Sequence, residues 1–444
     1  MSTTPPLSLR FRGNWSDDEL RSLLTVDATK IENLSALGPT EAQSRLETAL
    51  KQVVVPTSQM VSGMKYLIER AGTYCDGAYP NERAVLGLIY GSESTYSPEN
   101  RRATCITGLA GVGKSVLFDS FMRLFGGPIA FDMPGHAGLE LRPCWRMTIR
   151  GRAGFSSLVL PHFRIKDTIS PSRIYETARS EAAAQGIALI LADEFQFISS
   201  TNANTMMASL LYRLAEIGPP VIYACNFSMV NALWRRPQQD RDRLLLNPIV
   251  LKPENTGPEW QYTVEGMLAV AEEYSGLNSV HAVQVLHDYT FGIKRCLRSL
   301  LSLAYMQMRR TREQKVLLSH VTAAYHSLEY AAMREDVENL VQGTVSPKLL
   351  RKDLACPLVD NTSALDGPPK KEKDIVPTQA MKGATHAALL SMVAPEIRAL
   401  LLKMDDQAFS PEKRIPKALR KPHPSVENLL GGAERFASRD KKDE

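Results

Sequence analysis

The chain has 444 residues, 44% of them hydrophobic, which is enough for two or three domains with at least one large core. No stretch approaches the roughly 20 consecutive apolar residues that span a bilayer, and Met1–Gly13 contains no apolar segment typical of a signal peptide. We therefore expect a cytoplasmic protein without a membrane partner. The formal net charge of +5 is compatible with a polyanionic partner but selects none, since many ordinary enzymes have this balance.

The cysteines are far apart in the sequence. They form no C-x-x-C pair, and no histidine lies nearby at metal-ligand spacing. We expect reduced, mostly buried thiols at all six positions: Cys75, Cys105, Cys144, Cys225, Cys296 and Cys356.

In chain order, the first 56 residues are polar and interrupted, with short helices expected at Ser16–Leu24 and Glu41–Gln52. We interpret residues 1–56 as an N-terminal extension, either an arm or a small helical domain. Thr57–Ala71 then places apolar residues at helical spacing and predicts an amphipathic helix that packs on the following core. A second helix is expected at Glu82–Tyr90.

From Thr104 onwards, apolar strands alternate with periodic helices, a pattern that favours a parallel sheet covered on both faces. Residues 57–253 are therefore predicted to form an α/β core around a doubly wound, five-stranded parallel sheet. The five strands are expected at Ala103–Thr107, Cys144–Ile149, Ala188–Ala192, Val221–Cys225 and Pro248–Leu251.

After Lys252 the strand pattern ends, and residues 254–340 are predicted to form a helical lid. Residues 341–444 contain frequent prolines and a basic run, Lys413–Lys421. We expect much of this tail to be disordered when alone, and to be either a solvated terminus or a segment that binds a partner. Helices are expected at Glu265–Tyr274, Ser279–Thr290, Lys294–Arg310 and Leu318–Leu340 in the lid, and at Ala394–Met404 in the tail.

The strongest chemical signal is the run from Gly108 to Ser115, which matches G-x-x-x-x-G-K-[ST] in full. It follows a predicted strand and precedes a helix at Val116–Phe125, as this motif requires. Its backbone N–H groups and the helix N-terminus form a cradle for phosphate, Lys114 contacts the β- and γ-phosphates, and Ser115 supplies a hydroxyl to Mg²⁺. We therefore expect ATP and Mg²⁺ to bind here. The predicted nucleotide-binding residues are Gly108, Leu109, Ala110, Gly111, Val112, Gly113, Lys114, Ser115 and Val116.

Two carboxylates follow the apolar strand Ala188–Ala192. Such a buried strand delivers acidic side chains to the carboxyl edge of a parallel sheet. Asp193 is predicted to hold the Mg²⁺ shell. Glu194 is predicted to orient and deprotonate the water that attacks the γ-phosphate.

Three further positions have two readings each. Asn226 follows the strand Val221–Cys225 and either contacts the γ-phosphate or caps the helix Ser228–Trp234. Arg241 or Arg243 either completes the site of a neighbouring subunit or belongs to a solvated basic face. Arg295 opens a lid helix and either closes over the phosphates or is a surface cation.

The order of these motifs, from the phosphate loop to the lid residues Gly292-Ile-Lys-Arg295, resembles the AAA+ ATPases. The stretches Asp193-Glu-Phe-Gln-Phe197 and Gln239–Pro253 are similar to the TnsC/TniB regulators of DNA transposition. The likeness covers roughly residues 57–340, and the phosphate loop and acidic pair alone specify little beyond nucleotide.

This resemblance implies an ATPase that assembles as a ring or filament of identical subunits around double-stranded DNA. It further implies that the assembly receives a target-selection protein, recruits the transposase and comes apart on hydrolysis. DNA would be held through its phosphates with little base reading. Arg150, Arg152 and Lys166 are the candidate residues, and the alternative for each is an ordinary surface charge.

Other functions fit the same motifs. One is a replication helper ATPase that loads a helicase, and another is a signalling switch NTPase that does not bind DNA. A small-molecule kinase is disfavoured, since it would use a short lid and substrate-binding arginines within the core.

Overall fold

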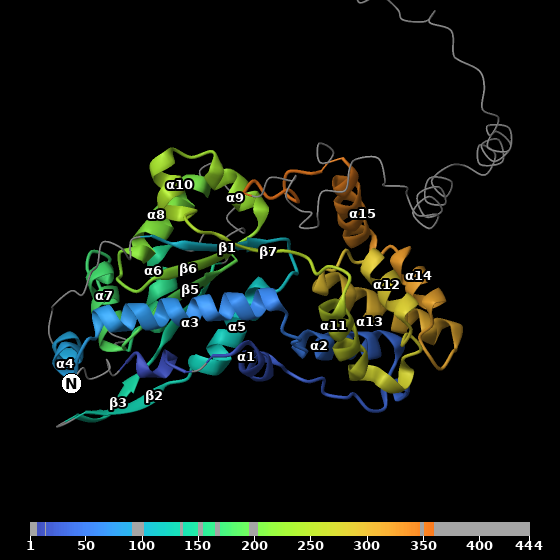
Figure 1. Ribbon diagram of the computed structural model, residues 1–444, viewed down its shortest axis with the longest axis horizontal. Coiled ribbons are helices and arrows are strands. Elements are labelled where there is room, and N and C mark those ends of the chain that lie inside the picture. Colours follow the sequence, from blue (N-terminus) through green and yellow to red (C-terminus); the bar gives the residue numbers. More distant parts are fainter. Residues whose placement is uncertain are drawn as a thin grey trace, which may run out of the picture. The chain divides into compact units, whose positions relative to one another are not determined.

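The computed structural model describes residues 7–13, 15–90, 102–133, 136–149, 154–164, 169–194, 203–346 and 350–358 (Figure 1). The chain divides into two compact units, Met1–Ala364 and Leu365–Glu444, and all described residues belong to the first. Within this described part, no helix is both long and apolar enough to span a membrane. The predicted tail helix and the basic run Lys413–Lys421 lie outside the described residues.

The core is a five-stranded sheet in the order β4-β5-β6-β1-β7, in which every neighbouring pair is parallel. Each predicted strand is present, with its ends shifted by at most one residue. Because β1 lies between β6 and β7, the loop that follows it opens at the carboxyl edge between the ends of these two strands. The bounds are β1 Thr104–Gly108, β4 Cys144–Thr148, β5 Leu189–Asp193, β6 Val221–Cys225 and β7 Ile249–Leu251.

Successive side chains of the strands enter two different hydrophobic clusters, one on each face of the sheet. Ile106 and Ile222 belong to the cluster on the side of α3 and α5, while Cys105 and Tyr223 belong to the cluster on the side of α6 and α8. This is the pattern of strands buried on both faces. The covering helices are α3 Ser58–Ala78, α4 Glu82–Tyr90, α5 Lys114–Phe125, α6 Phe155–Val159, α7 Ile174–Ala184, α8 Ala203–Ala215, α9 Phe227–Trp234 and α10 Gln238–Leu244.

A helical lid follows β7. Together with the phosphate loop and the parallel sheet, this lid confirms the predicted fold class, an AAA+ type P-loop fold. Its elements are α11 Pro258–Leu268, the 3-10 helix η6 Ala269–Tyr274, α12 Val280–Asp288, α13 Lys294–Thr311, α14 Leu318–Tyr325 and α15 Ala331–Val345.

Two helix predictions in the lid were wrong. The helix expected at Glu265–Tyr274 begins at Pro258, which suits a first helical position, and ends at Leu268. The 3-10 helix that follows has a kink at Ala271, whose φ is −134°. The helix expected at Leu318–Leu340 breaks between Tyr325 and Tyr330. Both rings are buried and lie 5.8 Å apart, which a single straight helix prevents because residues five apart point about 140° away from each other.

A two-stranded antiparallel hairpin was missed. Its strands are β2 Ile129–Met133 and β3 His136–Leu141, and they form a sheet separate from the core. The sequence signal was the Pro134-Gly135 dipeptide between two short apolar runs, which is a turn signature.

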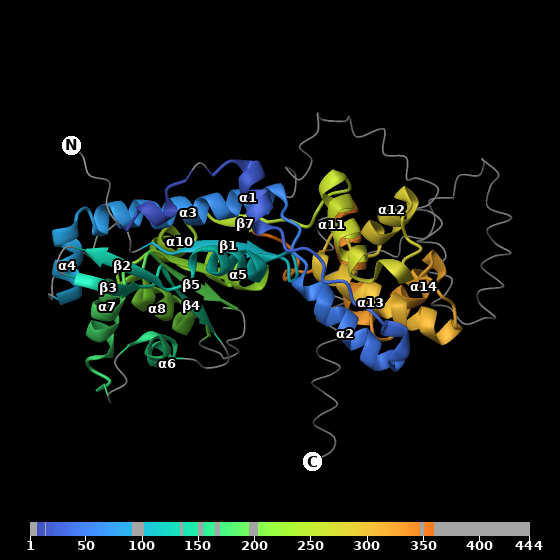
Figure 2. The ribbon, with the colours of Figure 1, turned by 90° about the horizontal axis from the view of Figure 1, so that it is seen from below.

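The N-terminal segment packs on both the core and the lid. Its helices α1 Asp17–Leu24 and α2 Pro39–Gln52 lie where helices were expected, and η1 Leu9–Phe11 and η2 Leu34–Ala36 are short 3-10 helices. The Phe11 ring lies 5.7 Å from the Phe125 ring of α5, and α2 packs along α13 of the lid (Figure 2). Buried residues of the segment 7–56 therefore belong to the same hydrophobic cluster as α3, α5 and the lid.

Residues 350–358 follow the lid and return to the core. The side-chain amide of Asn231, on α9, donates hydrogen bonds to the carbonyl oxygens of Lys352 at 2.8 Å and Ala355 at 3.2 Å. These bonds hold the end of the described chain against the helix that follows β6.

We expect Phe11→Ala to lower the free energy of unfolding by about 3 kcal/mol, because it removes a buried ring and leaves a cavity against α5. Urea denaturation followed by tryptophan fluorescence measures the change. Leu9, in the same 3-10 helix, is 55% exposed, so Leu9→Ala is the matched control and should change stability by less than about 0.5 kcal/mol. If both substitutions changed the free energy of unfolding by the same small amount, the Phe11 ring would not be part of the hydrophobic core.

Candidate functional site

The phosphate loop joins β1 to α5, and glycine is required at two of its positions. Gly108 and Gly111 have φ values of 156° and 92°. A Cβ atom on Gly108 would lie 2.3 Å from the carbonyl oxygen of Leu251, and one on Gly111 would lie 2.4 Å from Cβ of Arg295. The loop is therefore packed directly against β7 on one side and the lid on the other, without room for side chains.

Lys114, the first residue of α5, is only 8% exposed. Its Nζ donates to the carbonyl oxygens of Gly108 and Leu109 and to Oδ1 of Asn226, each at 2.8 Å. All three acceptors are neutral, so the ammonium lacks a full charge partner among the residues it bonds. Burial lowers the pKa of Lys114 to about 8. A buried cation held by neutral oxygens beside a glycine loop fits an anionic ligand such as a phosphate group.

Asn226 lies at the N-cap position of α9, where the sequence left two roles open. Its side chain makes no capping hydrogen bond and instead accepts the bond from Lys114. Since β6 is the strand beside β1, the residue after β6 reaches the loop after β1 directly. The geometry therefore favours a role at the phosphate loop over a role as a helix cap.

Asp193 and Glu194 lie at the end of β5, the next strand along the sheet. Asp193 is 4% exposed, and its Oδ1 accepts a hydrogen bond from the backbone N–H of Glu194 at 2.9 Å. Glu194 has a left-handed φ of 61°, a conformation that costs a non-glycine residue of order 1–3 kcal/mol. Residues 195–202, including Phe195 to Phe197 of the family motif, lie outside the described residues.

Arg146, on β4, was missed by the sequence reasoning. Its Nη2 lies 3.0 Å from Oδ2 of Asp193 and 2.9 Å from Oδ1 of Asp119, and its guanidinium lies 5.2 Å from the centre of the Phe118 ring. Burial raises the pKa of Asp119, against the effect of Arg146. The available signal was a charged residue inside an otherwise apolar strand, which is costly unless the charge is paired.

The lid reaches the loop through the start of α13. The backbone N–H of Arg295 donates to the carbonyl oxygen of Gly111 at 3.3 Å, while its side chain is exposed. Beside it, Nζ of Lys294 lies 3.5 Å from Oε1 of Glu254, and burial lowers the pKa of Lys294. Arg295 is therefore placed next to the loop.

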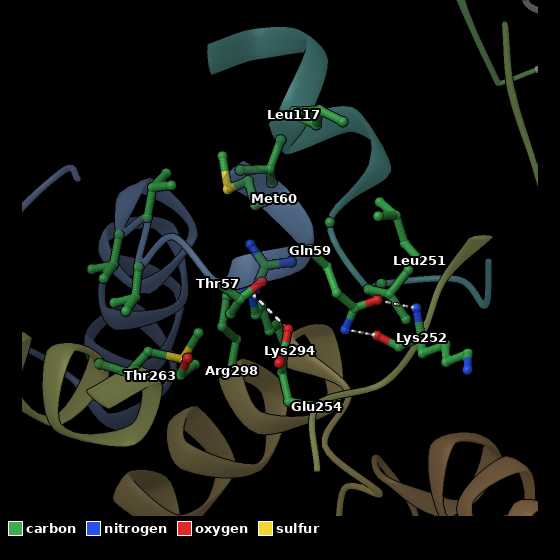
Figure 3. A pocket seen from close by; sticks show the side chains of 18 of the residues that line it. Thr57, Gln59, Met60, Leu117, Leu251, Lys252, Glu254, Thr263, Lys294 and Arg298 are labelled. Atoms are coloured by element: carbon green, nitrogen blue, oxygen red, sulfur yellow. Dashed lines mark hydrogen bonds and ion pairs between the residues drawn. The ribbon is translucent and has the colours of Figure 1, made fainter. Parts of the chain in front are cut away.

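A pocket lies beside Gly111–Gly113 (Figure 3). Its walls come from three parts of the chain, namely the segment before and at the start of α3, the residues after β7, and the lid. Gln59 bonds the backbone of Lys252 through both atoms of its side-chain amide, at 2.8 and 3.3 Å. Sequence reasoning missed these lining residues because no local pattern joins them. Among them are Val53, Val54, Val55, Met60, Leu251, Thr263, Met267 and Arg298.

The two arginines proposed to act on a neighbouring subunit lie on α10. The Arg241 guanidinium lies 5.4 Å from the ring centre of Trp234, and that of Arg243 lies 5.9 Å from the ring centre of Tyr212. Trp234 is 44% exposed, so Arg241 and this ring form part of the surface. The candidate DNA-binding residues Arg150, Arg152 and Lys166 lie outside the described residues.

No protein-family model matches the chain, and no curated protein matches it. Among solved structures, Cdc6p from Pyrobaculum aerophilum matches with 14% identity and a TM-score of 0.34, over 50% of this chain and 59% of that one. The ORC2 protein of Aeropyrum pernix matches with 12% identity and a TM-score of 0.35, over 50% and 61%. RuvB of Thermotoga maritima, a Holliday junction branch migration motor, matches with 9% identity and a TM-score of 0.33, over 56% and 69%.

This chain therefore spans about three fifths of the length of the Cdc6p and ORC2 structures. At these identities and TM-scores the similarities define neither a family nor a function. The fold assignment rests on the strand order, the phosphate loop and the lid.

We expect Gly111→Ala to weaken ATP binding by at least about tenfold, since the new Cβ would push Arg295 and the lid away from the loop, and about 1.4 kcal/mol suffices for that factor. Titration with a fluorescent ATP analogue measures the affinity. Gly127→Ala is the matched control, because a Cβ there meets no atom within 4 Å. Unchanged affinity in Gly111→Ala would show that the loop-to-lid contact is dispensable.

Proposed function

We propose that this chain is a magnesium-dependent ATPase that assembles on double-stranded DNA and regulates DNA transposition. The single observation behind the ATPase assignment is the buried Lys114 ammonium, held by neutral oxygens of the glycine loop and by Asn226. Asp193 and Glu194 lie on the adjacent strand end, so residues suited to hold phosphate, metal and water come from three neighbouring strands.

In this proposal each residue has one task. Lys114 turns from the loop carbonyls to the β- and γ-phosphates, and Asn226, which already bonds Lys114, contacts the γ-phosphate or the attacking water. Ser115 and Asp193 would hold magnesium, which neutralises charge on the phosphates when bound. Glu194 would accept a proton from the attacking water. The water oxygen would then bond to the γ-phosphorus, while the bond from the γ-phosphorus to the oxygen that bridges to the β-phosphate breaks.

The pocket beside Gly111–Gly113 is the proposed place of the nucleoside. Its aliphatic walls suit a flat base. Its cations suit the sugar and phosphate side of the ligand, and one of them, Lys294, is paired with Glu254. These cations are Lys51, Lys252, Lys294 and Arg298. Arg295 is proposed to close over the phosphates from the lid.

The more specific assignment to transposition rests on the TnsC/TniB-like stretches. One of them, Gln239–Pro253, contains α10 and β7, and it includes Leu244 and Leu245, which are buried in the core cluster. These two leucines therefore stabilise the core. The arginines of the same stretch are the candidates for contact with another subunit. The proposed assembly is a homo-oligomer in which Arg241 or Arg243 completes the site of the neighbouring copy.

We expect Glu194→Gln to keep ATP binding and to lower ATP hydrolysis by about 100-fold or more, because it removes the general base and leaves the phosphate cradle intact. Lys114→Ala, by contrast, should abolish ATP binding. Steady-state phosphate release and nucleotide titration separate the two effects. Full turnover by Glu194→Gln would show that the acidic pair has been assigned incorrectly.

We further expect the Glu194→Gln protein with ATP to assemble on duplex DNA of arbitrary sequence and to recruit a transposase, whereas ADP should support neither. Electron microscopy and a pull-down with the transposase measure the two steps, and a target-selection protein can be added to the same mixture. ATP-dependent recruitment of a replicative helicase in place of a transposase would assign the helicase-loader function. Failure to bind DNA with ATP would favour a signalling switch.

The matched variant for the DNA step is Arg150→Ala combined with Arg152→Ala and Lys166→Ala. It should weaken DNA binding. It should also make binding less dependent on salt, since each lost phosphate contact reduces by about one the slope of the logarithm of the binding constant against the logarithm of the salt concentration. ATP hydrolysis without DNA should be unchanged. An unaltered salt slope would exclude these residues from the DNA contact.

A further inference from the structure

Arg146 bridges two carboxylates next to the nucleotide site. It projects from β4 towards the end of β5, where Nη2 alone contacts both Asp193 and Asp119, at 3.0 and 2.9 Å. The side chain of Arg146 is 20% exposed and that of Asp193 is 5% exposed, so this pair lies largely out of water. Without Arg146, Asp193 would be a buried carboxylate with no cation bonded to it, which is strongly unfavourable.

The hydrogen bonding of this guanidinium is incomplete. Its other terminal nitrogen, Nη1, is buried and has no partner among the described residues. A guanidinium is most stable when its two terminal nitrogens bond the two oxygens of one carboxylate, yet here one nitrogen serves two carboxylates and the other serves none. Arg146 is therefore shared between Asp193 and Asp119 without an optimal bond to either. A shift of the guanidinium to one of the two carboxylates alone would allow it to bond both oxygens of that carboxylate.

Asp119 is able to take the guanidinium alone. It lies four residues after Ser115 on α5, so it shares a helix face with the residue proposed to bind magnesium. Its side chain is 69% exposed, which leaves it free to turn both oxygens towards Arg146. Asp193 has no such freedom, because it is buried and its Oδ1 is bonded by the backbone of Glu194.

A divalent metal held by Asp193 and a guanidinium bonded to the same carboxylate would repel each other in a region of low polarity. We propose that Arg146 is a positioning residue that holds Asp193 in the nucleotide-free protein and moves to Asp119 when magnesium and nucleotide bind. This inference rests on the proposed nucleotide site. Its consequence is that the magnesium requirement depends on Arg146 and Asp119 in opposite directions.

The test measures the magnesium concentration that gives half-maximal binding of a fluorescent ATP analogue, with no hydrolysis required. Arg146→Met should lower this concentration by about tenfold, since the metal then meets no competing cation, and tenfold corresponds to about 1.4 kcal/mol. Asp119→Asn should raise it by about three- to tenfold, because Arg146 then has no second acceptor and stays on Asp193. When Arg146→Met is already present, adding Asp119→Asn should not change the magnesium concentration further.

Arg142→Met is the matched control. Arg142 lies just before β4 and pairs with Glu140 at the surface, so its loss should leave the magnesium requirement unchanged. Thermal unfolding of the nucleotide-free proteins checks that each variant is folded. If Arg146→Met does not fold, Asp119→Asn alone decides the question, because Asp119 is exposed and its loss is compatible with folding.

A higher magnesium requirement in Arg146→Met would overturn the exchange, since it would mean that Arg146 supports Asp193 in the loaded state. The exchange would also be overturned if Asp119→Asn left the magnesium requirement unchanged. The same holds if Asp119→Asn raised that requirement equally in the wild-type protein and in Arg146→Met. If the wild-type protein shows no magnesium-dependent nucleotide binding, the proposed function itself fails and the exchange fails with it. Normal wild-type binding with unaffected variants overturns the exchange alone.

Discussion

The buried ammonium of Lys114 is the interaction on which the rest of the site depends. It requires oxygen acceptors, which explains why the carbonyl groups of Gly108 and Leu109 point towards it. It also explains why the side chain of Asn226 bonds Lys114 and makes no capping bond to α9. The strand order is what makes this possible, because β1 lies directly beside β6. A cation with a pKa lowered by burial, and with no carboxylate bonded to it, keeps this part of the sheet prepared for an anion.

The features predicted correctly from the sequence are those with a local cause. Apolar runs such as Val221–Cys225 predict buried strands because burial on both faces admits few polar residues. The failures have tertiary causes. The break before Tyr330 depends on the space beside Tyr325, and the kink at Ala271 interrupts a helix without any proline or glycine at that position. The β2–β3 hairpin is not part of the core sheet, so the alternation of strands and helices along the sequence does not predict it.

The candidate site shows the same division. The positions of Lys114 after β1 and of Asp193 at the end of β5 could be predicted, because the glycine loop and the acidic strand end are local patterns, while their roles stay a proposal. Arg146 was not predicted, since its pairing with Asp193 depends on the register in which Thr148 of β4 lies beside Asp193 of β5. Asn226 shows an intermediate case, in which the sequence left two roles and the hydrogen bond to Lys114 favours one.

The pocket beside the loop joins parts of the chain that are far apart in sequence. Val53–Val55 belong to the N-terminal segment, Gly111–Gly113 to the loop, and Lys294 and Arg298 to the lid, and all of them line the same space. A ligand that fills this space contacts all three parts at once, so its binding free energy stabilises their arrangement by mass action. The N-terminal segment packs on α5 through Phe11 and on α13 through α2, so it contacts both the lid and the helix after the phosphate loop.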